Sequence, residues 1–183
     1  NKGHKVDTFI IDDNSEILGI NDRVQLAEAN EILRKRIIKS HMMNGVTFVD
    51  PNSSYLDGDI SIEPDTIVYP NCILESGTVI GSECVIGPNS RIVNSQIGNN
   101  TEINNSVIMD SKVGNNTKVG PFAYIRPKNV VGDNIKVGDF VELKNSTIGD
   151  NTKISHLTYV GDSDIGKNVN IGCGVVTVNY DGK

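Results

Sequence analysis

The chain has 183 residues, 37% of them hydrophobic, and a formal net charge of −6. This length supports one substantial core with a small appendage. An acidic chain lacks the clustered basic face that nucleic acid or an anionic membrane requires, so we expect neither as a partner. No apolar run approaches the roughly 18 residues of a membrane span, and no signal-peptide core follows the N-terminus. The composition therefore predicts a soluble, cytoplasmic protein.

Two short segments precede the main pattern of the chain. Residues 5–12, VDTFIIDD, predict a short strand, and the first twenty residues are too few to fold alone. Residues 22–43 then show helical spacing, with a cap available at Asn21 or Asp22 and a closing glycine at Gly45. The apolar residues that share one face of this helix are Leu26, Ala29, Leu33 and Ile37.

From residue 62 onward, aliphatic residues recur about every six positions. Of the twenty intervals in the series, fifteen are six residues long and five are five residues long. Glycine often follows the aliphatic residue, and a small or β-branched residue usually stands four places after it. The members of the series are Ile62, Val68, Leu74, Ile80, Ile86, Ile92, Ile97, Ile103, Ile108, Val113, Val119, Ile125, Val131, Val137, Leu143, Ile148, Ile154, Val160, Ile165, Ile171 and Thr177.

This period predicts a solenoid of short strands. Six residues do not complete a whole number of 3.6-residue turns, so an α-helix would not keep the aliphatic residues on one face. A chain that makes a short strand, turns a corner and repeats points each aliphatic residue inward, and glycine relieves the steric cost of the corner. The hexapeptides resemble those of the left-handed parallel β-helix, in which three make one coil. We therefore expect a mainly β fold of about seven coils, and its left hand is implied by the resemblance alone.

The cysteines predict neither disulfides nor a zinc cluster. Their number is odd and no C-x-x-C pair occurs among Cys72, Cys84 and Cys173. A disulfide framework needs an even set and a zinc cluster needs closely spaced ligands, so we expect three reduced thiols.

Several stretches within and before the repeats resemble one protein family. It is the bifunctional bacterial enzyme that acetylates glucosamine-1-phosphate and then uridylylates the product to UDP-N-acetylglucosamine, for peptidoglycan and cell-envelope synthesis. The stretches cover most of the chain in the family's order and spacing. They are GINDRVQLAEAN at 19–30, GVTFVDP at 45–51, GPFAYIRP at 120–127, DFVELKNSTIG at 139–149, HLTYVGDSDIG at 156–166 and NIGCGVVTVNYDG at 170–182.

The resemblance implies a domain organisation, ligands and an assembly. Residues 1–20 would be the end of a nucleotidyltransferase domain, residues 21–45 a linker helix, and residues 46–183 a β-helix acetyltransferase domain that is incomplete at its C-terminus. Acetyl-CoA would be the co-substrate, Mg²⁺ would serve the uridylyltransferase half of the full-length protein, and the assembly would be a homotrimer. We expect the 183-residue chain alone to bind the sugar phosphate weakly and to transfer acetyl groups poorly.

Acetyl transfer to an amine needs a base, and His156 has a suitable side chain. An imidazole titrates near neutral pH, with an ordinary pKa of about 6.5. A carboxylate behind the ring would orient it and stabilise its charged form. Glu142 is the candidate, and the resemblance implies that His156 and Glu142 hold these catalytic roles.

The resemblance also implies a phosphate site at Arg126 and Lys144. A planar guanidinium and an ammonium point charge both suit a phosphate. The two residues are 18 apart, so a coil of three hexapeptides would stack them on one corner, about 4.8 Å from strand to strand. Two cations at that separation repel each other unless an anion lies beside them.

Other positions take their expected roles from the resemblance alone. Cys173 stands near the expected thioester of acetyl-CoA, where family members commonly carry alanine. Asn21 matches the family's magnesium-binding asparagine, but as a sequence feature it fits a helix cap better, and we expect no metal on the 183-residue chain. The residues expected at the sugar are Tyr159, Asn170, Asn179 and Tyr180.

Two alternatives have a weaker basis in the sequence. A β-helical carbonic anhydrase needs three zinc-binding histidines, and only His156 lies within the repeats, while His4 and His41 lie outside them. A non-catalytic structural or binding β-helix stays open. An ice-binding form of it would need regular Thr-x-Thr ladders, and the threonines of this chain are scattered.

Overall fold

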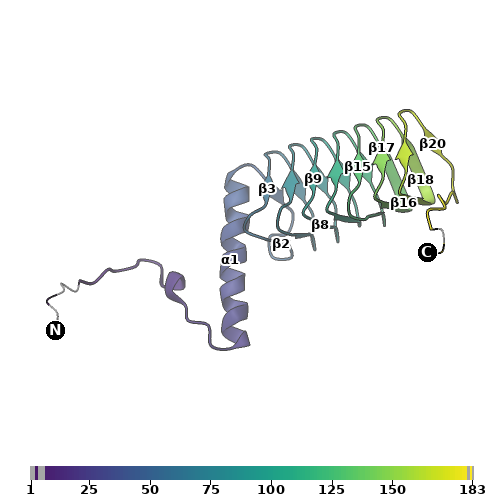
Figure 1. Ribbon diagram of the computed structural model, residues 1–183. Coiled ribbons are helices and arrows are strands. Elements are labelled where there is room, and N and C mark those ends of the chain that lie inside the picture. The colour runs from purple at the N-terminus through teal and green to yellow at the C-terminus, as the bar shows by residue number, and fades with distance from the viewer. Residues whose placement is uncertain (1–2, 4–6, 181, 183) are drawn as a thin grey trace.

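The computed structural model describes residue 3, residues 7–180 and residue 182. An extended N-terminal arm leads into one helix, which stands across the first coil of an elongated prism of short strands (Figure 1). The arm and the C-terminal residues lie at opposite ends of the molecule. The architecture is a β-solenoid with a helix against its first coil.

The strand predicted within residues 5–12 is wrong for the residues that the structure describes. Residues 7–12 form no strand, and the arm then makes one 3₁₀ turn, η1 (Asn14–Ile17). Phe9 and Ile10 are 90% and 85% exposed. A strand needs a partner for its backbone groups, and no strand of the described chain pairs with the arm. Residues 5 and 6 lie outside the described residues.

The predicted helix is confirmed as α1 (Arg23–Met43). Asp22 is its N-cap, because its side chain accepts a hydrogen bond from the backbone N–H of Gln25 at 2.8 Å. Gly45 ends the helix with a φ of +93°, in the left-handed region that glycine enters without strain. No helix of the described chain is both long enough and apolar enough to cross a membrane.

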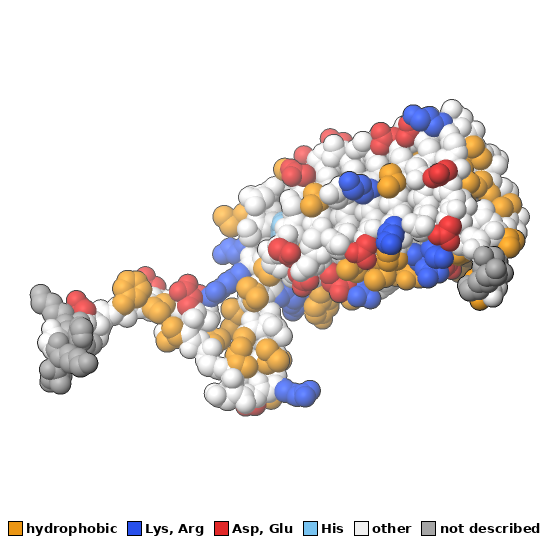
Figure 2. All heavy atoms as spheres, in the orientation of Figure 1, with side chains coloured by type: hydrophobic (Ala, Val, Ile, Leu, Met, Phe, Trp, Pro, Cys, Tyr) orange, Lys and Arg blue, Asp and Glu red, His pale blue; other side chains and the backbone are white. Residues whose placement is uncertain are grey.

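The predicted apolar face of α1 is mostly exposed. Leu26 and Leu33 are 44% and 55% exposed, whereas Ile38 is buried at 2%. One half of α1 packs on the first coil, and the half that begins at Arg23 projects beyond the prism (Figure 1). Figure 2 shows apolar side chains gathered on this projecting half and on the arm. The spacing places these residues on one face, of which Ile37 packs against the core, whereas no described segment covers Leu26 and Leu33.

The remaining elements of the described chain are short strands that pair in parallel. As far as the pairing of β13 with β16, strands three places apart in the chain are hydrogen-bonded neighbours, so three strands make one coil. From the pairing of β14 with β16 onward the neighbours are two places apart, because β16 and β18 each span two faces. The strands are β1 (Thr47–Phe48), β2 (Tyr55–Leu56), β3 (Ser61–Ile62), β4 (Ile67–Val68), β5 (Ile73–Leu74), β6 (Val79–Ile80), β7 (Val85–Ile86), β8 (Arg91–Val93), β9 (Gln96–Ile97), β10 (Glu102–Ile103), β11 (Val107–Met109), β12 (Lys112–Val113), β13 (Lys118–Val119), β14 (Tyr124–Ile125), β15 (Val130–Val131), β16 (Lys136–Lys144), β17 (Thr147–Ile148), β18 (Lys153–Gly161), β19 (Asp164–Ile165) and β20 (Asn170–Ile171).

The strands form the three faces of the prism. The face that starts with β3 is a sheet of seven strands, one from each coil. The other two faces join into one sheet of 13 strands, because β16 and β18 each continue round the corner between them. The mainly β fold of about seven coils that the period predicted is thus confirmed, and so is the left-handed parallel β-helix that the resemblance implied.

The interior of the prism is the predicted aliphatic column. Members of the series from Val68 to Val160 are at most 4% exposed, and Ile165 and Ile171 are partly buried against them. The small residues of the repeat are buried too, and Thr66 satisfies its hydroxyl by donating to the carbonyl oxygen of Gly81 at 2.8 Å. The repeat in the sequence is thus the packing repeat of the core.

Left-handed backbone recurs at the corners of the prism. Most of these residues are asparagine or aspartate, the types other than glycine that tolerate a positive φ best. Several form ladders from coil to coil. The Asn71 amide donates to Asn89, whose own amide donates to Asn105 at 3.0 Å. In the later coils of this same corner the left-handed residues are bulky and apolar instead, and the backbone N–H of the first of them bonds the Asn105 carbonyl at 2.9 Å. They are Phe122, Phe140 and Leu157.

Candidate functional site

The predicted site residues concentrate on the two long strands. β16 and β18 pair in parallel along nearly their whole length. This register places Asp139 opposite His156 and Glu142 opposite Tyr159, with Lys144 at the end of β16. Because both strands are tied to neighbours on each side, these side chains project from a rigid surface.

His156 has a carboxylate partner, but it is not the one predicted. Its Nδ1 lies 2.5 Å from Oδ1 of Asp139, and this hydrogen bond lowers the pKa of the Asp139 carboxyl. Glu142 lies three residues further along β16 and accepts a hydrogen bond from Nη1 of Arg126 at 2.9 Å. The expected contact between Glu142 and the imidazole is therefore wrong in this structure, because the parallel register sets Asp139 against His156.

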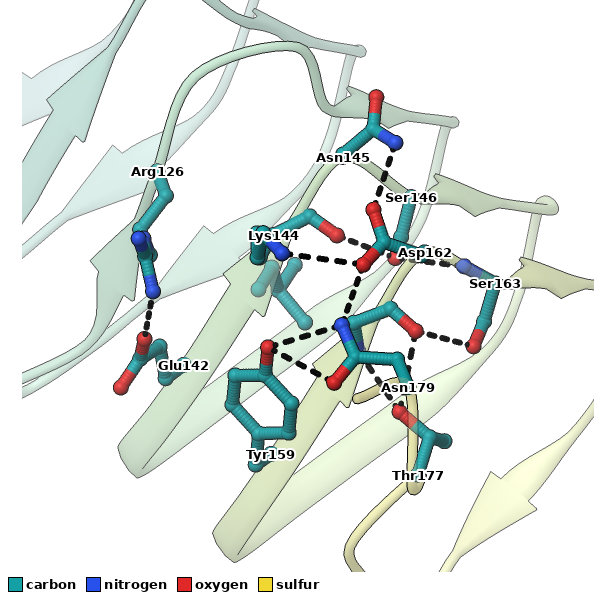
Figure 3. A network of polar contacts seen from close by, with 12 residues as sticks. Arg126, Glu142, Lys144, Asn145, Ser146, Tyr159, Asp162, Ser163, Thr177 and Asn179 are labelled. Atoms are coloured by element: carbon teal, nitrogen blue, oxygen red, sulfur yellow. Dashed lines mark hydrogen bonds and ion pairs between the residues drawn. The ribbon is translucent and has the colours of Figure 1, made fainter. Parts of the chain in front are cut away.

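Arg126 and Lys144 lie one coil apart on the same corner, as their spacing predicted. Ile125 pairs with Leu143, so the next residue of each strand is one of the two cations. Arg126 forms an ion pair with Glu142, and Nζ of Lys144 lies 3.0 Å from Oδ2 of Asp162. The expected repulsion between the cations is thus offset within the chain, and each side chain points to its own carboxylate (Figure 3).

A polar network joins three successive coils beside Lys144 (Figure 3). Oδ1 of Asp162 accepts a hydrogen bond from the Asn145 amide at 2.7 Å, and Oδ2 accepts from the Asn179 amide as well as from Lys144. The Asn179 amide nitrogen also lies 3.2 Å from the Tyr159 hydroxyl. These donors, first Asn145 and then Lys144 and Asn179, lower the pKa of Asp162 to about 2, so its carboxylate is ionised at neutral pH.

The other expected site residues lie away from this network. Asn170 is on β20, opposite Lys153, and therefore on the neighbouring face of the prism. Cys173 is exposed and follows His156 by 17 residues. It lies at the same corner in the next coil, because the N–H of Gly174 donates to the carbonyl of Leu157 at 3.0 Å. Tyr180 is 76% exposed. The described chain thus brings some of the predicted residues together and leaves others apart.

The residues around Asn21 do not form a magnesium site by themselves. The backbone N–H of Asn21 donates to the side-chain oxygen of Gln25 at 2.7 Å, and Asp22 is engaged as the helix cap. Mg²⁺ requires about six oxygen ligands in an octahedral arrangement, usually with one or two carboxylates. Within the described residues no three His, Cys, Asp or Glu side chains gather where a metal ion could bind.

An apolar column runs along the corner that carries His156. Phe122, Phe140 and Leu157 occupy equivalent positions in successive coils and are 57%, 56% and 57% exposed. The two phenyl rings stack with their centroids 5.4 Å apart. Bulky residues rarely adopt a positive φ, so this corner combines local strain with exposed apolar surface next to the candidate base.

Sequence reasoning missed two residues of the site, Asp139 and Asp162. The signal that could have found them is the coil spacing already used for Arg126 and Lys144. Asp139 precedes His156 by 17 residues, and Asp162 follows Lys144 by 18. In a solenoid with coils of 16 to 18 residues, each of these separations places two side chains on the same corner.

The fold and the site define a left-handed parallel β-helix that presents an imidazole–carboxylate pair and a bonded cationic corner on its surface. The profile of the family described as the GMPPB C-terminal domain matches residues 56–126 and again residues 110–180. The chain belongs to this family.

Curated relatives confirm the resemblance to the bifunctional enzymes. The "Bifunctional protein GlmU" of Acetivibrio thermocellus is 63% identical over 183 residues, and that of Clostridioides difficile is 58% identical over 182. Both alignments include 100% of this chain and 40% of the relative. The chain thus spans about two fifths of the length of these relatives.

Among solved structures, the fold is similar to the acetyltransferase domain of PglB from Neisseria gonorrhoeae. The TM-score is 0.53 at 13% identity, over 69% of this chain and 63% of the other. A second structure of that domain, in complex with acetyl coenzyme A, gives a TM-score of 0.51 at 13% identity, over 77% of this chain and 62% of the other. At this identity the likeness concerns the fold.

Proposed function

We propose that the β-helix transfers an acetyl group from acetyl-CoA to the amine of glucosamine-1-phosphate. The observation that carries the proposal is the His156–Asp139 pair on β16 and β18, beside a corner that holds two cations. The similarity to curated proteins named GlmU, and the likeness of the fold to an acetyltransferase domain solved with acetyl coenzyme A, support the same reaction.

In this mechanism His156 is the general base. Nδ1–H of His156 donates a hydrogen bond to Asp139, which fixes the tautomer and leaves the lone pair on Nε2. Nε2 takes a proton from the sugar amine as its nitrogen attacks the thioester carbonyl. The C–S bond then breaks, and the thiolate of coenzyme A leaves and is protonated. The imidazolium that forms is stabilised by the ionised Asp139.

The sugar phosphate would bind beside the corner where β16 and β18 end, next to Lys144. Arg126 and Lys144 supply the positive charge, and a phosphate dianion would accept from the N–H donors that these side chains do not use for Glu142 and Asp162. Tyr159 and Asn179 offer a hydroxyl and an amide to the sugar. Glu142, opposite Tyr159, orients Arg126 in this proposal.

The residues that lie apart also fit the proposal if the protein is a homotrimer. Asn170 lies on the neighbouring face and Tyr180 is exposed at the C-terminal end, so both are accessible to a second subunit. The exposed column of Phe122, Phe140 and Leu157 gives a second copy an apolar edge next to His156. We propose that a site assembled from two subunits unites these residues, with Cys173 near the acetyl group of acetyl-CoA.

A longer protein containing this chain would carry the second activity of the bifunctional enzymes. We propose uridylyl transfer from UTP to N-acetylglucosamine-1-phosphate there, with Asn21 as one Mg²⁺ ligand among others supplied from outside the described residues. The product would be UDP-N-acetylglucosamine, made in the cytoplasm for cell-envelope synthesis. The Mg²⁺ would neutralise phosphate charge in that reaction.

The test replaces the base in the full-length enzyme. His156→Ala is expected to lower the rate of acetyl transfer roughly 10²–10⁴-fold, the usual contribution of a general base, measured by release of coenzyme A thiol. His41→Gln is the matched control, because His41 lies on α1 far from the long strands, and its rate should stay near normal. A near-normal rate for His156→Ala would remove His156 from the mechanism.

A further inference from the structure

The carboxylate of Asp162 binds more groups than its place in the fold requires. Asp162 follows β18 at a corner of the prism, and its backbone N–H donates to the carbonyl of Lys144 at 2.9 Å. Its side chain accepts hydrogen bonds from Lys144, Asn145 and Asn179 (Figure 3). Two of these three donors belong to the proposed sugar-phosphate site, and they come from coils on either side of Asp162.

The corner ladder explains only one of these contacts. Asp110 occupies the same corner three coils earlier, where its carboxylate accepts from the Asn94 amide at 2.7 Å. Asp162 repeats this rung with Asn145, and all four residues have left-handed φ values between +42° and +49°. The bonds from Lys144 and from Asn179 have no counterpart at Asp110 among the contacts of the described chain.

The extra contacts restrict side chains that would otherwise be mobile. A lysine side chain loses up to about 2 kcal/mol of rotamer entropy when it is fixed. Asp162 holds Lys144 at two points, by a bond to its backbone carbonyl and by a 3.0 Å ion pair to its Nζ, with the two side chains 38% and 35% exposed. The Asn179 amide is held between Asp162 and the Tyr159 hydroxyl.

We propose that Asp162 is a positioning residue that presets Lys144 and Asn179 for the phosphate and the sugar. The inference rests on the proposed acetyl transfer to glucosamine-1-phosphate. Because the ordering is completed before the substrate arrives, its loss weakens sugar-phosphate binding and leaves the proton transfer at His156 unchanged. Asp162 thus lowers the KM for glucosamine-1-phosphate, and it does so through Lys144 and Asn179.

The first test compares two aspartates of the same corner in the full-length enzyme. Asp162→Asn is expected to raise KM for glucosamine-1-phosphate roughly three- to tenfold, with kcat and KM for acetyl-CoA near those of the parent. Asp110→Asn is the matched control and should leave all three constants unchanged. A fall in KM for Asp162→Asn would overturn the proposal, because it would mean that the carboxylate competes with the phosphate for Lys144.

The second test asks whether Asp162 acts through Lys144. In a Lys144→Met background the ammonium is absent, so Asp162 can assist the substrate only through Asn179, while its own charge repels the phosphate. Asp162→Asn should therefore raise KM for glucosamine-1-phosphate by a clearly smaller factor in that background than in the parent, or leave it unchanged. A rise by a similar factor in both backgrounds would overturn the proposal and assign Asp162 a general structural role.

Different results would contradict the proposed acetyl transfer and the positioning role of Asp162. If the parent enzyme does not acetylate glucosamine-1-phosphate, the proposed function is wrong. If the parent is active and Asp162→Asn behaves like Asp110→Asn in all three constants, the positioning role alone is wrong. Equal melting temperatures of Asp162→Asn and Asp110→Asn would show that their kinetic constants do not differ because one variant unfolds. An Asp162→Glu variant with a parent-like KM would support a role for the negative charge.

Discussion

At the scale of single residues, the two carboxylates of β16 have separate partners. Asp139 lies 2.5 Å from Nδ1 of His156, and Glu142 lies 2.9 Å from Nη1 of Arg126. The first contact fixes the tautomer of the proposed base, whereas the second holds a group proposed to bind phosphate. Substitutions at the two positions should therefore change different kinetic constants.

Asp139→Asn in the full-length enzyme should lower kcat for acetyl transfer, by up to the roughly 10²–10⁴-fold contribution of the base itself. An amide holds the ring less firmly and does not stabilise the imidazolium. Glu142→Gln should instead raise KM for the sugar phosphate, because Arg126 loses its charged partner. Steady-state kinetics of both variants would show which constant, kcat or KM for the sugar phosphate, each substitution changes. A kcat loss in Glu142→Gln alone would return the orienting role to Glu142.

The three thiols should differ in reactivity because their surroundings differ. Cys72 and Cys84 are 0% exposed, and burial raises the pKa of Cys72 to about 11 and also raises the pKa of Cys84. The thiolate is the reactive form, so both are protected near pH 8. An excess of a maleimide should label one thiol of the folded protein quickly, at Cys173, as read by mass spectrometry of peptides. Fast labelling of Cys72 would contradict its burial inside the prism. The control is denatured protein, in which all three thiols should be labelled.

At the scale of elements, close contact between β16 and β18 depends on the absence of a side chain. A Cβ built at Gly138 would lie 1.9 Å from the carbonyl oxygen of Ser155, a separation that no real Cβ contact shows. Gly138 directly precedes Asp139, and Ser155 directly precedes His156. The glycine thus allows the two strands to approach where the imidazole meets its carboxylate.

Gly138→Ala should destabilise the chain by about 1–3 kcal/mol or more, because the strands must move apart. Gly58→Ala is the control, since a Cβ there meets only Ile37 at an ordinary 3.9 Å, and its stability should change little. Urea unfolding followed by circular dichroism measures both. Equal stability of the two variants would show that β16 and β18 are less closely packed than described.

At the scale of the whole molecule, two apolar surfaces are left uncovered by the residues that the structure describes. One is the projecting half of α1 with its apolar face, and the other is the column of Phe122, Phe140 and Leu157. The column lies along the corner of the proposed base, whereas α1 stands at the opposite end of the prism (Figure 1). The column is therefore the surface that we propose to meet another subunit.

Light scattering of the 183-residue chain should give three times the 19.8 kDa of one subunit. Phe140→Asp should shift this mass towards the monomer, because a charge replaces an apolar ring at the proposed contact, and aspartate tolerates the left-handed φ of +55°. Val130→Asp changes a half-exposed residue of another face and should leave the trimer intact. A monomer for the parent at micromolar concentration would count against the homotrimer.

The sequence predicted the fold closely and the site only in part. The six-residue period placed Val68, Ile125 and Leu143 in the core, and the coil spacing placed Arg126 beside Lys144. The strand expected in residues 5–12 failed for its described part because no partner strand lies beside it. The carboxylate behind His156 was assigned to Glu142 by resemblance, whereas the register selects Asp139.

The sequence by itself determined the repeating unit, because burying one aliphatic side chain in each short strand is a local pattern with a fixed period. It also determined both ends of α1, since Asp22 and Gly45 act on neighbouring backbone groups. Only the tertiary structure decided which charges neutralise one another. Five-residue steps shift the stacking partner from 18 to 17 or 16 residues away, so the pairing of Asp139 with His156 depends on how successive coils align.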